Sequence, residues 1–193
     1  ELKIGHKSCS IELSGQGCRE FEGLAKDRTW LDLLEFFIVK LNASPTRIDI
    51  AIDDYDGNII TFEEVKRKLD LSHFTTSFQD KDFIMHGSNK KGISIQFGSH
   101  SSTQMLVIYE KLKEQITKGL DCLQVYWIRY EMRYRHEKAF NVCMNIINHA
   151  NSGFKEYVFG LLYSMLDIKA DNNYGEDNIH KAKTDEQWQA FLD

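Results

Sequence analysis

The segment Arg47–Asp53 (RIDIAID) alternates strictly between isoleucine and other residues. A period of two is typical of a strand that has one buried face and one open face. The three isoleucines therefore predict a side facing the core. The other side carries Asp49 and Asp53 on either side of Ala51, and two carboxylates are too polar to bury without partners. The chain is therefore expected to build a sheet that leaves one face polar.

The rest of the chain mixes strand and helix patterns. Further strands are expected at Lys7–Leu13, Phe74–Phe78, Ile84–His86, Gly92–Phe97, Met105–Tyr109 and Val125–Arg135. Helical spacing of apolar residues predicts helices at Trp30–Leu41, Thr61–Leu69, Lys111–Lys118, Lys138–Ala150 and Phe154–Leu166. Turns or loops are expected at Ser14–Arg19 and over residues 171–187. This order favours an α+β fold: a central, mainly antiparallel sheet whose apolar face is covered by Trp30–Leu41 and Lys138–Ala150.

Length and composition indicate one ordinary domain over residues 1–193. The chain is 42% hydrophobic and 27% charged, which is typical of a folded domain and not of a disordered one. No window approaches the ~18 apolar residues of a membrane span. The start, ELKIGHKSC, has neither an initiator Met nor an apolar signal core, so a fragment of a longer chain is expected. Four cysteines without metal-ligand spacing predict free thiols in a reducing cytoplasm, with a disulfide as the minority alternative.

The net charge of −5 conceals an uneven distribution. Residues 171–193 carry six acidic and two basic residues, so 22 of the 24 basic and 23 of the 29 acidic residues lie before them. Within that nearly neutral part, Tyr126–Lys138 carries a basic stripe of three arginines and a lysine. Such a stripe is compatible with nucleic-acid binding, and equally with a solvated strand face.

Alternation assigns polar side chains of two more strands to shared faces. Trp127, Arg129, Glu131, Arg133 and Arg135 share one face of the strand at 125–135, and Met105, Val107, Tyr109 and Lys111 share one face of the strand at 105–111. Asp49, Asp53 and Glu131 are candidate ligands for Mg²⁺ or Mn²⁺, which prefer hard oxygen donors. The alternative is that these carboxylates are solvated or paired with arginine.

Tyr109 is a candidate nucleophile, because tyrosine can form covalent intermediates. Of the eight tyrosines, Tyr109 has a lysine, Lys111, two positions on and on the same face, which is expected to favour the phenolate. Lys111, Arg129 and Arg133 are candidate phosphate contacts. On the alternative interpretation Tyr109 is a packing residue. The sequence offers three histidines as further candidate site residues: His86, His100 and His136.

Several common motifs are absent from the sequence. There is no GxGxxG, GxxxxGK[ST], GxSxG or HExxH. P-loop nucleotide hydrolysis, a Rossmann cofactor site, a nucleophile elbow and zincin chemistry are therefore unsupported.

Six segments occur in an order that is more informative than any one of them. They are Ser14–Arg19 (SGQGCR), Arg47–Asp54 (RIDIAIDD), Gly92–Ser101 (GISIQFGSHS), Ile108–Lys111 (IYEK), Ile128–Arg133 (IRYEMR) and Trp188–Leu192 (WQAFL). Together they resemble the replication initiation factor family, which comprises rolling-circle plasmid initiators and MobT-type relaxases of conjugative elements. The resemblance covers most of the chain.

The resemblance implies a metal-dependent DNA nicking and joining domain. The family's R-I-Y-x-K motif matches Tyr109 as the nucleophile of a 5′-phosphotyrosyl intermediate, with Lys111 and Arg129 as catalytic partners. Its R-x-D-x-A-x-D and R-x-E motifs match Asp49, Asp53 and Glu131 as ligands of Mg²⁺ or Mn²⁺. DNA contacts are expected from Arg133, Arg135 and His100.

Two positions depart from the family pattern, since Val107 and His100 stand where many relatives have arginine. Two alternatives therefore stay open: a DNA-binding module of the same fold that has lost nicking, and an unrelated α+β protein. Single-stranded or extruded origin DNA is the expected substrate. The resemblance further leaves room for a homodimer and for a helicase or transfer-machinery partner, and it implies no membrane association.

Overall fold

The computed structural model describes residues 1–4, 9–79, 83–88, 92–149 and 152–193. The chain separates into two compact units, Glu1–Ser44 and Pro45–Asp193. The sequence-based expectation of one catalytic domain over residues 1–193 stays a prediction. Among the described residues, no helix is both long enough and apolar enough to span a membrane.

The first unit holds a short hairpin and helices. β1 (Leu2–Ile4) pairs antiparallel with β2 (Cys9–Ile11), and these strands are followed by α1 (Gly15–Leu24), α2 (Trp30–Leu34) and a π-helical continuation, Glu35–Lys40. The strand predicted at Lys7–Leu13 lies partly outside the described residues. The turn predicted at Ser14–Arg19 is wrong, because α1 begins there with Ser14 as its N-cap. Its two glycines suggest a turn, yet Gln16 bonds to both Arg19 and Glu20 across the first helical turns.

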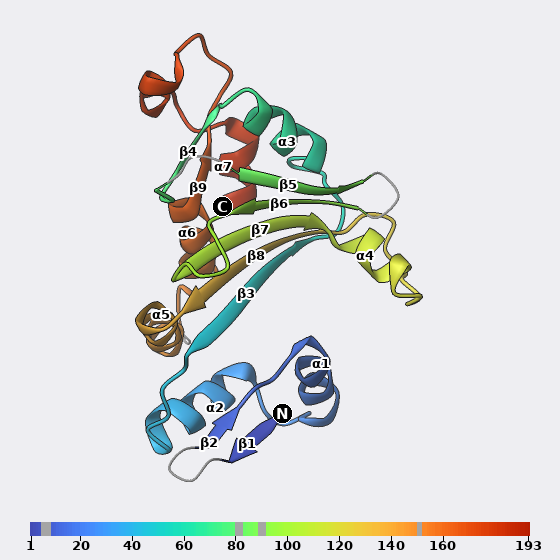
Figure 1. The fold of residues 1–193 in the computed structure, drawn as a ribbon, viewed down its shortest axis with the longest axis vertical. Helices are drawn as coiled ribbons and strands as arrows, with labels where there is room; N and C mark the ends of the chain where they lie inside the picture. The colour runs from blue at the N-terminus through green and yellow to red at the C-terminus, as the bar shows by residue number, and fades with distance from the viewer. Residues whose placement is uncertain (5–8, 80–82, 89–91, 150–151) are drawn as a thin grey trace. The chain divides into compact units, whose positions relative to one another are not determined.

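The second unit is built around a five-stranded antiparallel sheet (Figure 1). Its strands are β3 (Arg47–Asp54), β8 (Ile128–Arg135), β7 (Gln104–Glu110), β6 (Gly92–Phe97) and β5 (Phe83–Ser88), in that spatial order. Each neighbouring pair is antiparallel, so the predicted α+β class with a mainly antiparallel sheet is confirmed.

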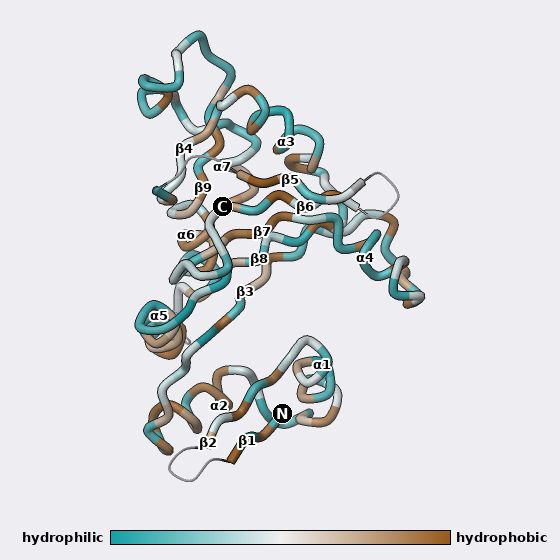
Figure 2. The backbone as a smooth tube through the Cα atoms, viewed as in Figure 1, coloured by the Kyte–Doolittle hydropathy of each residue, from teal (hydrophilic) through white to brown (hydrophobic). Residues whose placement is uncertain are grey.

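One face of this sheet is the core. Ile95, Ile108, Tyr130 and Met132 are fully buried, and Figure 2 shows hydrophobic stretches along β5 and β6. The isoleucines of β3 share this face but are only half-buried, because β3 is the edge strand next to β8.

Two helices of the second unit contact this apolar face. α5 (Glu137–Asn148) contacts β8 and β3, as predicted for Lys138–Ala150. α7 (Glu186–Leu192) packs through Trp188 and Phe191, whose rings lie 6.0 and 5.0 Å from that of Tyr130. The other helix that was predicted to cover the apolar face, Trp30–Leu41, belongs to the first unit. The cysteine of α5, Cys143, is a buried thiol, and burial raises its pKa to about 11.

A smaller sheet and further helices complete the unit. β4 (Phe74–Thr76) pairs with β9 (Leu166–Ile168), beside α3 (Phe62–Asp70) and α6 (Phe154–Met165). Thr61 caps α3 by accepting a hydrogen bond from the backbone N–H of Glu64, the bond that is typical of an S/T-x-x-E segment. The segment predicted as a loop after residue 171 instead contains a 3₁₀-helix, Glu176–Lys181, and the first residues of α7.

Candidate active site

The second face of the central sheet carries polar side chains in rows that the strand register defines. Asp53, Arg129, Tyr109, Ser94 and His86 are successive cross-strand partners from β3 to β5. Residues directly opposite each other share a face, so these five form one row across the whole sheet. The predicted alternation is therefore confirmed on three strands.

The next rows continue the same face. Glu131 lies between Ala51 on β3 and Val107 on β7, and Arg133 lies between Asp49 on β3 and Met105 on β7. The register thus brings the three predicted carboxylates and Tyr109 to neighbouring positions on one face.

Tyr109 and Glu131 are joined by a hydrogen bond. The tyrosine hydroxyl donates to Oε2 of Glu131 at 3.1 Å. Burial, with the negative charge of Glu131 added to it, raises the pKa of Tyr109 above its usual value of 10, although Arg129 acts in the opposite direction. Tyr109 is therefore a phenol at neutral pH, and the group that can accept its proton is already in contact with it.

Lys111 does not act as the sequence predicted. It is the first residue of α4 (Lys111–Thr117) rather than a strand residue. Its Nζ lies 5.6 Å from the centre of the Tyr109 ring and 2.7 Å from Oε2 of Glu114. Because Glu114 balances the lysine charge while burial and Glu131 oppose ionisation, the predicted stabilisation of a phenolate is wrong.

Asp53 is held by two side chains of the neighbouring segment. Arg129 donates through Nε and Nη2 to the two carboxylate oxygens, each at 2.7 Å, and the indole nitrogen of Trp127 donates to Oδ1 at 2.7 Å. Burial opposes ionisation of Asp53, yet these hydrogen bonds outweigh it and lower its pKa. Burial also opposes the charge of Arg129, but the contact with Asp53 outweighs it and raises the pKa of Arg129, so the pair is fully charged at neutral pH.

The other two carboxylates also contact arginines. Asp49 accepts from Nε of Arg47 at 2.8 Å and lies 3.6 Å from Nε of Arg133. Arg133 in turn donates to Oε1 of Glu131 at 2.6 Å. In the part of the chain that the structure describes, three or more His, Cys, Asp or Glu residues nowhere gather as a metal-binding group. The predicted convergence of Asp49, Asp53 and Glu131 into one ligand group is therefore not observed.

The donor set nevertheless has the chemistry that a hard cation requires. All three residues are carboxylates on one face of adjacent strands, and each already contacts a positive group. Mg²⁺ and Mn²⁺ take such oxygen ligands together with water. These residues fit a divalent ion as donors, provided that the ion replaces an arginine contact.

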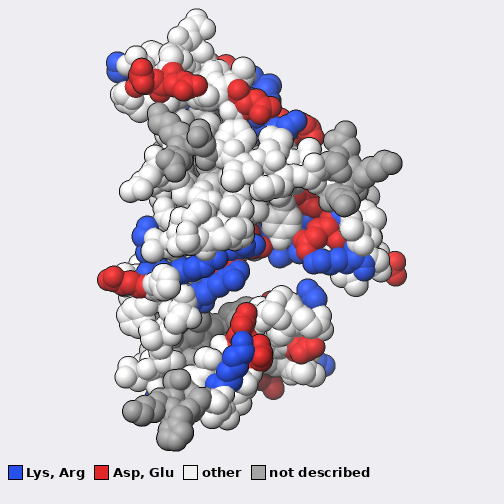
Figure 3. All heavy atoms as spheres, in the orientation of Figure 1, with Lys and Arg blue, Asp and Glu red and all other residues white. Residues whose placement is uncertain are grey.

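Of the three predicted DNA-contact residues, Arg133 contacts Glu131, and the other two lie toward the opposite end of the face. Arg135 donates to the backbone oxygen of Ser102 at 3.2 Å, and His100 is exposed in the same loop between β6 and β7. The strand from Gln104 to Tyr109 spans about 17 Å at ~3.4 Å per residue, so His100 is not close to the tyrosine. Figure 3 shows Lys and Arg side chains gathered over β3 and β8.

Sequence reasoning did not single out two neighbours of the tyrosine. Ser94 and His86 lie beyond Tyr109 in its row, and both line a pocket of about 220 Å³ next to it, together with Glu110 and Glu114. His86 was a candidate only as one of three histidines. The sequence favours a hairpin turn at residues 87–91 between these two strands, but it does not give their register, and the register is what brings His86 opposite Ser94.

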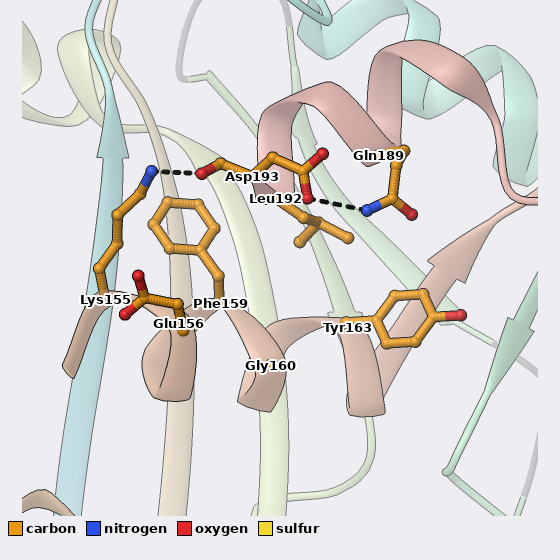
Figure 4. Close-up of a pocket in the computed structure, with 8 residues that line it drawn as sticks. All are labelled: Lys155, Glu156, Phe159, Gly160, Tyr163, Gln189, Leu192 and Asp193. Carbon is orange, nitrogen blue, oxygen red and sulfur yellow. Dashed lines mark hydrogen bonds between the residues drawn. The ribbon is translucent and has the colours of Figure 1, made fainter. Parts of the chain in front are cut away.

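A larger pocket, of about 300 Å³, lies elsewhere (Figure 4). Its lining comes from α6, α7 and the residue after α7: Lys155, Glu156, Phe159, Gly160, Tyr163, Gln189, Leu192 and Asp193. Because α7 packs against Tyr130 on the apolar face, this pocket is not part of the polar face that carries Tyr109.

Comparisons with known proteins agree with this arrangement. The family model described as replication initiation factor matches residues 43–193. The chain belongs to the replication initiation factor family. This match begins near the start of the second unit, so it covers the central sheet and leaves out the predicted Ser14–Arg19 motif.

Two relatives refine the family assignment. The chain is 35% identical over 137 residues to the putative DNA relaxase NicK of Bacillus subtilis (strain 168), a match that covers 67% of this chain and 38% of the relative. It is also similar to the structure of a rolling circle replication initiator protein from Geobacillus stearothermophilus, with a TM-score of 0.74 and 26% identity. That match covers 93% of this chain and 66% of the other. The chain thus spans less than two thirds of either relative.

Proposed function

We propose that the polar face of the second unit nicks and rejoins DNA through Tyr109. The observation that carries this proposal is the hydrogen bond from the Tyr109 hydroxyl to Glu131, on a face that also presents Arg129 and Arg133. A nucleophile in contact with a base and near phosphate-binding groups is the arrangement that phosphoryl transfer requires. The family match and the relaxase and initiator relatives support the same reaction.

In the proposed reaction Tyr109 attacks the scissile phosphorus. Its Oη forms the new P–O bond while its proton passes to Oε2 of Glu131. The bond from phosphorus to the 3′ oxygen breaks, and that oxygen takes a proton from solvent. The products are a 5′-phosphotyrosyl link and a free 3′-OH. One phosphodiester replaces another, so the link retains the energy needed for rejoining and no nucleotide cofactor is required.

The basic residues are assigned to the DNA backbone. Arg129 uses Nε and Nη2 for Asp53, and a guanidinium has five N–H donors, so it retains capacity for a phosphate oxygen. Arg133 and Arg135 extend the positive charge along β8, and exposed His100 adds a donor at the far end. Lys111 is assigned to the phosphate near Tyr109. Single-stranded DNA laid along this face would therefore meet a cation at successive positions.

We further propose that nicking depends on a divalent ion, Mg²⁺ or Mn²⁺, held by Asp49, Asp53 and Glu131. When bound, such an ion supplies positive charge that polarises the scissile phosphate. Asp53 has a second role as the partner that orients Arg129. EDTA should therefore stop nicking, and added Mn²⁺ should restore it.

A second candidate function is DNA binding without nicking. Val107 favours it, because this residue lies opposite Glu131 on the polar face and replaces the arginine of the R-I-Y-x-K pattern that the sequence resembles. A site without that cation would hold the phosphate less firmly beside the tyrosine.

A nicking assay distinguishes the two candidates. The chain is incubated with Mn²⁺ and labelled single-stranded oligonucleotides that tile an origin of the same family, and cleavage is followed on denaturing gels. Nicking by the wild-type chain that is lost in Tyr109→Phe supports the first candidate. Equal binding by both proteins without cleavage would support the second.

A further inference from the structure

The polar face ends in two aromatic rings that the proposed chemistry does not use. Tyr55 comes two residues after Asp53 at the end of β3, and Trp127 comes two residues before Arg129 at the start of β8. Their ring centroids lie 5.3 Å apart with planes tilted by 42°. The last cross-strand pair of β3 and β8 is Asp54 with Ile128, so the two rings lie just outside the strands, beyond the row of Asp53 and Arg129.

Trp127 is fixed in place by the charged groups of the site. Its indole nitrogen donates to Asp53 at 2.7 Å, and the guanidinium of Arg129 lies 5.6 Å from its ring centre. Such a contact between a guanidinium and an indole ring is favourable in itself. The indole is thus a rigid support that shares partners with Arg129.

Tyr55 is the exposed member of the pair. Its relative exposure is 48%, and its hydroxyl lies 3.5 Å from Oδ2 of Asp53, at the outer limit of a hydrogen bond. The ring therefore rests on Trp127 and offers apolar surface to solvent beside a row of charges. An exposed aromatic ring next to backbone-binding cations is the combination that single-stranded DNA sites use.

We propose that Tyr55, supported by Trp127, stacks on an unpaired base of the DNA strand whose phosphate meets Arg129 and Tyr109. The proposal rests on the proposed function, because it uses the same strand and the same face. It adds a base contact to a face that otherwise holds only backbone contacts. Stacking is tolerant of sequence, since every base offers a π-face.

Binding to two simple probes tests this proposal without any cleavage. One is 15-nucleotide oligodeoxythymidylate, and the other is an abasic deoxyribose-phosphate chain of equal length, which keeps the phosphates and lacks the bases. Fluorescence anisotropy is measured in EDTA for the full chain, for Tyr55→Ala and for the matched control Tyr55→Phe, which keeps the ring. Chemical denaturation of each variant checks that it is folded.

We expect the wild-type chain to prefer the probe with bases. Tyr55→Ala should reduce that preference by roughly 5- to 150-fold, the range for one stacked base, while Tyr55→Phe should keep it. The salt dependence of binding should be the same in all three proteins, because phosphate contacts are unchanged. A preference that Tyr55→Ala leaves intact would overturn the proposal, as would a wild-type chain that does not distinguish the probes. If the wild-type chain fails to nick DNA but prefers the probe with bases, and Tyr55→Ala reduces that preference, the result would count against the proposed function alone.

Discussion

Two clusters of charged residues in the second unit use the same chemistry in opposite ways. In the first, Lys68 of α3 is only 2% exposed and contacts Asp185 at 2.8 Å, Asp171 at 3.0 Å and the backbone oxygen of Lys169 at 3.1 Å. In the second, Arg129 and Asp53 on the polar face are each about one fifth exposed. Both are ion pairs between distant segments of the chain.

The two clusters differ in the number of hydrogen-bond donors that each cation still has free for a ligand. The three contacts of Lys68 match the three donors of an ammonium group, so the cluster is complete and joins α3 to the acidic end of the chain. Arg129 reaches solvent with donors beyond those used for Asp53. A closed cluster stabilises the fold, whereas an open one is available to a ligand. Ion pairs alone therefore do not identify a site; a partly exposed cation beside the proposed nucleophile is what favours the polar face as the candidate site.

The largest expected effect is on the open cluster. Glu131→Gln removes the proton acceptor of Tyr109 but keeps the side-chain shape, so nicking should fall about 100- to 10,000-fold, the usual contribution of a general base. The unfolding free energy should change little by comparison, since Glu131 reaches solvent. The measurement is single-turnover nicking of an oligonucleotide that the wild-type chain cleaves. Near wild-type nicking by this variant would remove Glu131 from the mechanism.

The converse effect is expected at the closed cluster. Lys68→Met leaves Asp185 without its buried cation, and breaking such a pair costs about 3–5 kcal/mol of unfolding free energy. Denaturant unfolding measures this loss, with Lys66→Met on the same helix as the matched control at a half-exposed position. Nicking by Lys68→Met below its melting temperature should stay near the wild-type level. If the two methionine variants were equally stable, Lys68 would not be the structural cation described above.

The smallest expected effect is a pH dependence from Asp53. Its pKa is lowered in the folded chain, so its pairing stabilises the fold above about pH 4, near the ordinary aspartate pKa, and that contribution is lost as the pH falls through the folded value. The difference in unfolding free energy between the wild-type chain and Asp53→Asn should therefore be constant from pH 7 to 5. It should shrink below pH 4. A difference that stays constant to lower pH would mean that Asp53 is not paired as a carboxylate.

The alternation of apolar and polar residues along the strands accounts for most of the correct sequence-based predictions. The period of two over Arg47–Asp53 and Val125–Arg135 defines the faces of β3 and β8, and the structure confirms both faces, although β8 begins at Ile128 and not at Val125. Local pattern could not predict the order of the strands in the sheet or their register, so the row from Asp53 to His86 became visible only in the structure. The sequence-based prediction of a turn at Ser14–Arg19 was also wrong. The two glycines there favour a turn, but side-chain contacts within α1 favour the helix.

The candidate site shows the same limit. Sequence spacing correctly predicted that Tyr109 and Glu131 share one face of the sheet. It did not predict the environment of Lys111, because a helix begins at that residue and brings Glu114 into contact with its side chain. Strand periodicity also could not predict that arginines occupy the carboxylates proposed as metal ligands. It shows which face a side chain lies on, but not which partner it contacts.

The central claim is that Tyr109 forms the covalent bond to DNA. The most direct measurement traps the reaction with an oligonucleotide that carries a 3′-bridging phosphorothiolate at the nick site, so that the leaving group is a 3′ thiol that rejoins poorly. The protein is then digested and the adduct is mapped by mass spectrometry. We predict that the nucleotide is found on the peptide containing Tyr109, and that Tyr109→Phe gives no adduct. An adduct on any of the other seven tyrosines, or an unchanged yield with Tyr109→Phe, would contradict the account.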